Sequence, residues 1–255
     1  MELAEQVIDV ALAMDMWVFG GYVRDVIVRR QKKFGDIDLG CSDKKTNVEQ
    51  FIRVLGTRFD VDGVRSQKFN VAAEYGRMSK GIMRVERFVI NGTLHIDVVV
   101  FDGSFSDWCD EESVDFTSNL FFKSWDTELG IRYAPGRFRH MANPIAELVK
   151  MTRDGIFERI WDANDEHVNH MHVFQVCLRA KELVRRGFTF KGTLISPLME
   201  MRMLGYPAIE DRCAEIQEII DATQTRRSTR EMMKCLNRQG VHLPEEIYTN
   251  IESAV

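Results

Sequence analysis

The first 140 residues alternate between helical and strand-like spacing of apolar side chains. Apolar positions three or four residues apart predict helices at 2–15, 21–30 and 46–56. Alternating or continuous apolar runs predict strands near 16–20, 36–40, 58–62, 69–75, 82–90 and 94–101. The stretch 102–114 is acidic and rich in turn-forming residues, which predicts a loop. This mixture of signals predicts an α+β fold built on a mixed sheet.

From residue 141 onward the pattern is helical. Asn143-Pro144 is typical of a helix start, with an N-cap followed by proline at the first helical position, and apolar residues continue at helical spacing to Ile160. Further helices are predicted at 165–186, 193–204, 209–222, 226–238 and 244–253. Residues 188–191 give a weak strand signal. We therefore predict two domains, residues 1–140 with the mixed sheet and an all-helical domain at 141–255.

The composition limits the class of protein. No apolar run approaches the roughly 20 residues that span a bilayer, and the acidic N-terminus lacks the basic region of a signal peptide, so we expect no membrane partner. Five cysteines without a C-x-x-C pair favour reduced thiols and a cytoplasmic location. The net charge of −5 disfavours a generic polyanion coat, although a local basic stripe can still bind nucleic acid. No feature indicates the oligomeric state.

Two short segments near the N-terminus carry candidate chemistry. Gly20-Gly21 precedes a predicted helix, where backbone N–H groups favour a phosphate, and Arg24 adds a positive charge one turn later. Asp36 and Asp38 alternate with apolar residues on a predicted strand, so their side chains share a face. Two close carboxylates repel each other, and a divalent cation removes that cost. The pair therefore indicates a cation beside a phosphate-binding turn.

A third carboxylate, Asp97, lies in the middle of the apolar strand 94–101, where an unpaired charge would cost on the order of several kcal/mol. Three such acids can hold two Mg²⁺ ions, with Mn²⁺ as the alternative ion. A salt bridge to a buried arginine is the alternative role for Asp97. With the phosphate turn, Asp36, Asp38 and Asp97 predict metal-assisted phosphoryl or nucleotidyl transfer, with these residues as catalytic metal ligands.

These segments resemble the signature of a known enzyme family. Gly20-Gly21-Tyr22-Val23-Arg24-Asp25 and Asp36-Ile37-Asp38-Leu39 are similar to the G-G-x-V-R-D…D-I-D-L signature of the bacterial-type (class II) tRNA CCA-adding enzymes and poly(A) polymerases. That family belongs to the DNA polymerase beta-like nucleotidyltransferases. Asp115–Leu120 and Gly130–Tyr133 resemble later family segments, in the same order. The resemblance spans about residues 17–160 and implies a nucleotidyltransferase head followed by a helical neck and body.

The resemblance also implies roles for individual residues and ligands. Asp36, Asp38 and Asp97 would hold the metal ions. The nucleotide-binding residues would be Gly20, Gly21 and Arg24 at the triphosphate, and Asp115 and Asn119 at the sugar. The implied reaction transfers a nucleotide from an NTP, with ATP favoured, to the 3′ end of an RNA, with tRNA as one candidate acceptor.

The chain departs from the family pattern at several places, and two of them concern the incoming nucleotide. Ser113-Val114 stands where the family has an arginine pair, and Ala142–Ala146 lacks the acid and the arginine that recognise the incoming base. These differences leave open a catalytically inactive homologue that binds nucleotide or RNA. A transferase acting on a small-molecule or protein hydroxyl is a second alternative.

A basic stripe on the predicted helix 226–238 suits an RNA backbone. Its members recur at three- and four-residue spacing: Arg227, Arg230, Lys234 and Arg238. The alternative is a solvated helix face with Glu231 as an ionic partner. An extended basic stripe favours an RNA acceptor over a small one.

Overall fold

The computed structural model describes residues 2–44, 46–68, 81–110, 114–132, 138–160, 180 and 183–191. The chain divides into two compact units, Met1–Val71 with Met78–Ile160, and Ala72–Arg77 with Trp161–Val255. The first unit contains nearly all of the described residues. In the second unit the described part includes the short strand β9 (Thr189–Phe190). The helices predicted beyond residue 192 and most of the one at 165–186 lie outside the described residues, and the domain boundary at residue 140 stays a prediction.

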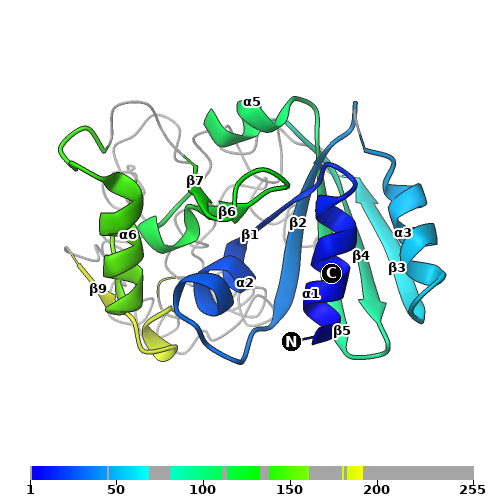
Figure 1. Cartoon of the computed structure of the whole chain (residues 1–255), viewed down its shortest axis with the longest axis horizontal. Coiled ribbons are helices and arrows are strands. Elements are labelled where there is room, and N and C mark those ends of the chain that lie inside the picture. Colours follow the sequence, from blue (N-terminus) through cyan, green and yellow to red (C-terminus); the bar gives the residue numbers. More distant parts are fainter. Residues whose placement is uncertain are drawn as a thin grey trace, which may run out of the picture. The chain divides into compact units, whose positions relative to one another are not determined.

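A seven-stranded sheet forms the framework of the first unit (Figure 1). Its strand order is β3-β4-β5-β2-β1-β6-β7. The strands are β1 (Trp17–Phe19), β2 (Asp36–Ser42), β3 (Val61–Lys68), β4 (Ile82–Ile90), β5 (Leu94–Phe101), β6 (Phe121–Lys123) and β7 (Gly130–Ile131). Strands β2 and β5 run parallel, and the other neighbouring pairs of this sheet are antiparallel. The mixed sheet with helices confirms the predicted α+β class.

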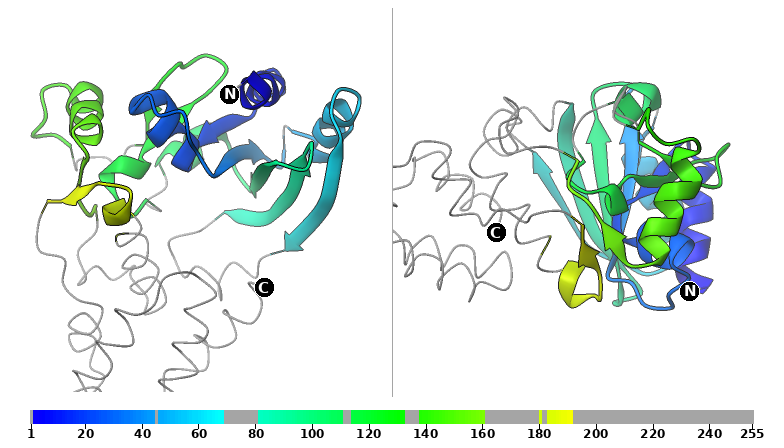
Figure 2. Two further views of the ribbon diagram at one scale, coloured as in Figure 1. Left: turned by 90° about the horizontal axis from the view of Figure 1, so that it is seen from below. Right: turned by 90° about the vertical axis from the view of Figure 1, so that its left-hand side faces the viewer.

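Helices α1 (Glu2–Leu12) and α3 (Val48–Gly56) cover one face of this sheet (Figures 1 and 2). The apolar stripe of α1 is buried, and Phe51 of α3 meets Phe88 of β4 with ring centroids 6.3 Å apart. Helix α3 begins at Asn47, whose side chain accepts a hydrogen bond from the backbone N–H of Gln50 at 3.0 Å. Burial of such large apolar side chains, at about 1.5–3 kcal/mol each, stabilises the packing of both helices on this face.

The opposite face carries an aromatic cluster beneath a short helix, α5 (Phe105–Asp110). Trp17 and Phe19 of β1 pack against Trp108 with centroids 5.2 and 5.3 Å apart. The indole of Trp17 lies across Gly40 of β2, where an added Cβ would come within 2.0 Å of Nε1. The absence of a side chain at Gly40 allows this close approach of the indole to β2.

The prediction of a loop at 102–114 is wrong for Phe105–Asp110, which form helix α5. The backbone N–H of Ser104 donates to Oδ2 of Asp107 at 2.7 Å, and the backbone N–H of Asp107 donates to Oγ of Ser104 at 3.2 Å. This reciprocal capping satisfies N–H groups at the helix start and stabilises a helix in a sequence that is otherwise turn-rich.

Other element boundaries also differ from the prediction. The helix expected at 21–30 is a short α2 (Gly20–Tyr22) followed by a π-helix, η1 (Val23–Val28). Helix α6 (Pro144–Arg153) begins at the predicted Asn143 cap but ends before Gly155, which has φ +72. The chain then forms a short strand, β8 (Ile156–Phe157), so the helix predicted to continue to Ile160 is wrong there.

Two other predicted strands have different outcomes. Strand β3 begins at Val61 and runs to Lys68, whereas the prediction was 58–62. The strand predicted at 69–75 lies outside the described residues.

A single 3₁₀ turn, η3 (Thr117–Asn119), precedes β6. Across the ranges given above, no helix combines the length and the hydropathy that crossing a membrane requires.

The contact between Trp17 and Gly40 predicts a specific stability effect. Gly40→Ala forces a methyl group into the indole and should lower the free energy of unfolding by about 1–3 kcal/mol. Urea denaturation followed by circular dichroism measures this change. Gly35→Ala is the matched control, because an added Cβ there meets nothing within 4 Å; equal stability of the two variants would contradict the packing.

Candidate active site

The structure brings the three predicted metal ligands to one face of the sheet. Asp36 and Asp38 alternate along β2, and Asp97 of β5 is the register partner of Asp38 in the parallel pair. Partnered positions on adjacent strands point to the same face, so all three carboxylates project there. Phe19 of β1 pairs with Asp38 from the other side, which places the acids on the face that carries the aromatic cluster.

The carboxylate of Asp97 is engaged by an arginine. Nε of Arg87 on β4 donates to Oδ2 of Asp97 at 3.1 Å, with 39% and 25% of the two side chains exposed. A salt bridge was the alternative role for Asp97, and it is the one present, although Arg87 is not buried. Among the residues that the structure describes, no three His, Cys, Asp or Glu side chains are arranged to hold a metal ion. The three acids thus share a face without forming a closed metal site.

The glycine turn lies directly against Asp38. Gly20 has φ +71, and a Cβ on it would come within 2.2 Å of Oδ2 of Asp38. A side chain at this position would therefore be strained twice, by its backbone conformation and by the carboxylate. Gly20 brings the start of α2 into contact with one of the two acids of β2.

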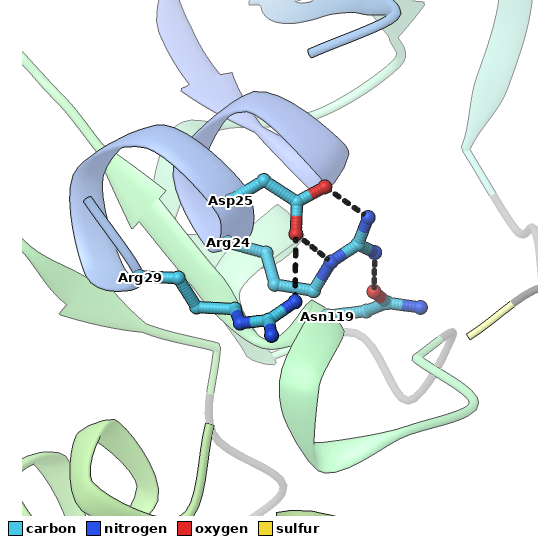
Figure 3. Close-up of polar contacts among 4 residues, drawn as sticks. All are labelled: Arg24, Asp25, Arg29 and Asn119. Carbon is cyan, nitrogen blue, oxygen red and sulfur yellow. Dashed lines mark hydrogen bonds and ion pairs between the residues drawn. The ribbon is translucent and has the colours of Figure 1, made fainter. Parts of the chain in front are cut away.

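Arg24 is held by protein partners (Figure 3). Its Nε and Nη2 donate to Oδ1 and Oδ2 of Asp25 at 2.9 and 2.7 Å, and its Nη1 donates to Oδ1 of Asn119 at 2.9 Å. Arg24 and Asp25 are only 6% and 3% exposed, and Nη1 of Arg29 lies 3.9 Å from Oδ1 of Asp25. A bidentate guanidinium–carboxylate pair of this kind fixes both side chains.

The same network includes the other two predicted nucleotide-binding residues. Nδ2 of Asn119 donates to Oδ1 of Asp115 at 3.0 Å, and the backbone N–H of Phe116 donates to the same oxygen at 2.9 Å. Nε of Arg153 on α6 donates to the carbonyl of Val28 at the end of η1. Segments 95 residues apart are therefore tied into one partly buried hydrogen-bonded unit.

Two residues of this region received no role from the sequence, namely Asp25 and Arg87. Asn91-Gly92 indicates a turn between β4 and β5, but a two-residue turn there would set Arg87 opposite Ile96, whereas the observed loop has three residues. Counting outward from that turn through the paired Ile90 and Leu94 places Arg87 opposite Asp97. The predicted RNA-binding residues lie outside the described residues: Arg227, Arg230, Lys234 and Arg238.

The thiols near this sheet are neutral at physiological pH. Burial raises the pKa of Cys41 to about 12 and that of Cys109 to about 11. A thiolate is the form that binds metal or attacks an electrophile, so neither group supplies that chemistry near pH 7.

Comparison with known proteins gives matches among solved structures. No family model matches the chain, and no curated protein does. A CCA-adding enzyme in complex with CTP is similar, at TM-score 0.47 and 16% identity over 91% of this chain and 50% of that one. The Bacillus stearothermophilus CCA-adding enzyme in complex with CTP gives TM-score 0.47 and 14% identity over 94% and 52%.

The Thermotoga maritima CCA-adding enzyme complexed with tRNA gives TM-score 0.46 and 14% identity over 99% of this chain and 62% of that one. This chain thus spans about half to three fifths of the length of these three structures.

The buried pair predicts an asymmetric response to substitution. Arg24→Met leaves the carboxylate of Asp25 buried without its bidentate partner and should cost about 3–5 kcal/mol of unfolding free energy. Replacing both residues, as in Arg24→Met with Asp25→Leu, should recover part of that loss, although it also removes the carboxylate that lies 3.9 Å from Arg29.

Urea denaturation of the single and double variants measures the effect. Lys150→Met, which breaks the exposed ion pair with Asp154, is the control and should leave the midpoint unchanged. A double variant less stable than Arg24→Met would contradict the pairing.

Proposed function

We propose that this protein is a metal-dependent nucleotidyltransferase that adds nucleotides from an NTP to the 3′ end of an RNA. ATP is the favoured nucleotide and tRNA is one candidate acceptor, both by the sequence resemblance. The proposal is supported above all by one observation: the register that sets Asp97 beside Asp38, with Asp36 on the same face of β2.

The donor chemistry of this face fits the proposed cation. Carboxylate oxygens are the ligands that Mg²⁺ and Mn²⁺ prefer, and Asp36 is exposed at the end of its strand. Asp36 and Asp38 would hold the cation. Asp97 would become a third ligand by giving up its ion pair with Arg87. When bound, such an ion activates the attacking hydroxyl and offsets the charge on the phosphoryl group.

The surrounding residues of the chain would position the nucleotide. Gly20 allows the backbone to approach the acids closely, so a triphosphate held at Gly20-Gly21 would lie beside Asp38. We assign Arg24 a positioning role, because its guanidinium holds the turn against Asn119 and Asp115. Asn119 is only partly buried and would face the sugar of the nucleotide. In this proposal catalysis depends mostly on positioning and charge stabilisation.

The ion pair between Arg87 and Asp97 favours a second candidate function. An arginine that neutralises Asp97 permanently would leave a face suited to binding nucleotide or RNA without catalysis. The two candidates differ in whether a divalent cation supports turnover.

Removal of one metal ligand tests the catalytic proposal. Asp36→Ala should lower NTP incorporation by more than about 100-fold, because even outer partners of a metal site contribute about 10- to 100-fold. The assay combines each labelled NTP with Mg²⁺ or Mn²⁺ and a pool of small RNAs, and it reads the length and base composition of any extension.

Asp62→Ala on the edge strand β3 is the control, since it removes an exposed carboxylate far from β2 in the strand order. Incorporation by Asp36→Ala at the wild-type level would refute the mechanism. Absence of incorporation by the wild-type protein, with nucleotide binding retained, would favour the second candidate.

An RNA acceptor predicts that the binding affinity falls as the salt concentration rises. If the stripe of Arg227, Arg230, Lys234 and Arg238 contacts four phosphates, log K for RNA should fall against log salt with a slope of about −3. Arg230→Ala should reduce the magnitude of that slope by about 0.7. Fluorescence anisotropy of a labelled single-stranded RNA measures it. A flat response would favour a small-molecule or protein hydroxyl as acceptor.

A further inference from the structure

Three charged side chains lie in one row across adjacent strands of the acidic face. Arg87 of β4 is the register partner of Asp97 on β5, and Asp97 is in turn the partner of Asp38 on β2. Two carboxylates directly opposite each other on neighbouring strands destabilise a sheet. Arg87 neutralises one of them through the 3.1 Å contact from Nε to Oδ2. The arginine thereby supplies a positive charge to this row.

A cation bound by Asp38 and Asp97 would supply the same charge. It would need the carboxylate oxygens of Asp97, one of which accepts from Arg87, and its own charge would repel the guanidinium one strand away. A divalent cation and the guanidinium of Arg87 would therefore compete for Asp97. Both partners of the ion pair are partly exposed, so their separation costs little and does not require the core to open.

We propose that Arg87 is an internal competitor of the divalent cation for Asp97 and thereby sets the cation affinity of the site. This inference rests on the proposed function, since it takes Asp36, Asp38 and Asp97 as the cation ligands. Arg87 acts here through Asp97 and is a positioning residue. Arg87 would release Asp97 when that carboxylate serves as a cation ligand, and would pair with it otherwise.

The competition predicts that removing the arginine tightens cation binding. Arg87→Met should lower the Kd for Mn²⁺ by about two- to fivefold, because partly exposed ion pairs contribute up to about 1 kcal/mol. Isothermal titration calorimetry with Mn²⁺ alone measures the Kd. Thermal melts with and without Mn²⁺ give a second readout, since a cation that binds the folded state raises its melting temperature.

Two controls make the result specific. Arg84→Met removes another arginine of β4, whose ion pairs are with Asp43 and Glu86, and should leave the Kd for Mn²⁺ unchanged. Arg87→Met in an Asp97→Asn background should give no further gain, because the contested carboxylate is absent. If Arg87→Met does not fold, Arg87→Gln serves in its place, with the same expected direction.

The outcomes separate this inference from the proposed function. A lower Kd and a larger Mn²⁺-induced rise in melting temperature for Arg87→Met support the competition. Equal or weaker Mn²⁺ binding by Arg87→Met, with normal binding by the wild type, overturns the competition and leaves the proposed function standing. No Mn²⁺ binding by either protein overturns the metal-dependent function together with the competition. A lower melting temperature with an unchanged Kd would assign Arg87 a structural role only, which also overturns the inference.

Discussion

The parallel pairing of β2 with β5 is the constraint on which the candidate site depends. It joins two strands separated in sequence by α3, β3 and β4, and it sets Asp38 beside Asp97. The cost of placing two carboxylates side by side in the middle of a sheet has to be met by a positive charge. Arg87 supplies this charge. It lies on β4, whose antiparallel pairing with β5 places it opposite Asp97. The sheet register therefore decides the chemistry of this face as much as the acids themselves do.

A second constraint fixes the glycine turn relative to that face. Gly20 contacts the carboxylate of Asp38 closely, and four residues later Arg24 is clamped between Asp25 and Asn119. Buried charged groups are costly unless they are paired and hydrogen-bonded, so this network holds one geometry. The glycine turn is therefore held in one position beside the acids. Catalysis that depends on positioning the substrate requires such preorganisation.

The sequence predicted the parts of the fold that local patterns encode. Alternation of apolar residues identified β4 and β5, and the Asn143-Pro144 pair marked the start of α6. Helix α5 was missed because its Ser104–Asp107 capping pair lies in a stretch whose composition indicates a turn. The apolar run that predicted β3 is short and weak, and local patterns do not show how far a strand continues beyond such a run. Strand β3 consequently extends further than predicted.

For the candidate site, periodicity identified which acids share a face but not their partners. The ion pair of Arg87 with Asp97 and the clamp on Arg24 depend on strand register and on packing between segments distant in sequence. The most direct test of the central claim is a crystal structure of the protein with Mn²⁺ and a non-hydrolysable NTP, in which anomalous scattering locates the metal. The site described here predicts Mn²⁺ bound by Asp36 and Asp38 with the triphosphate beside Gly20. A metal and nucleotide bound elsewhere, with no density at this face, would contradict it.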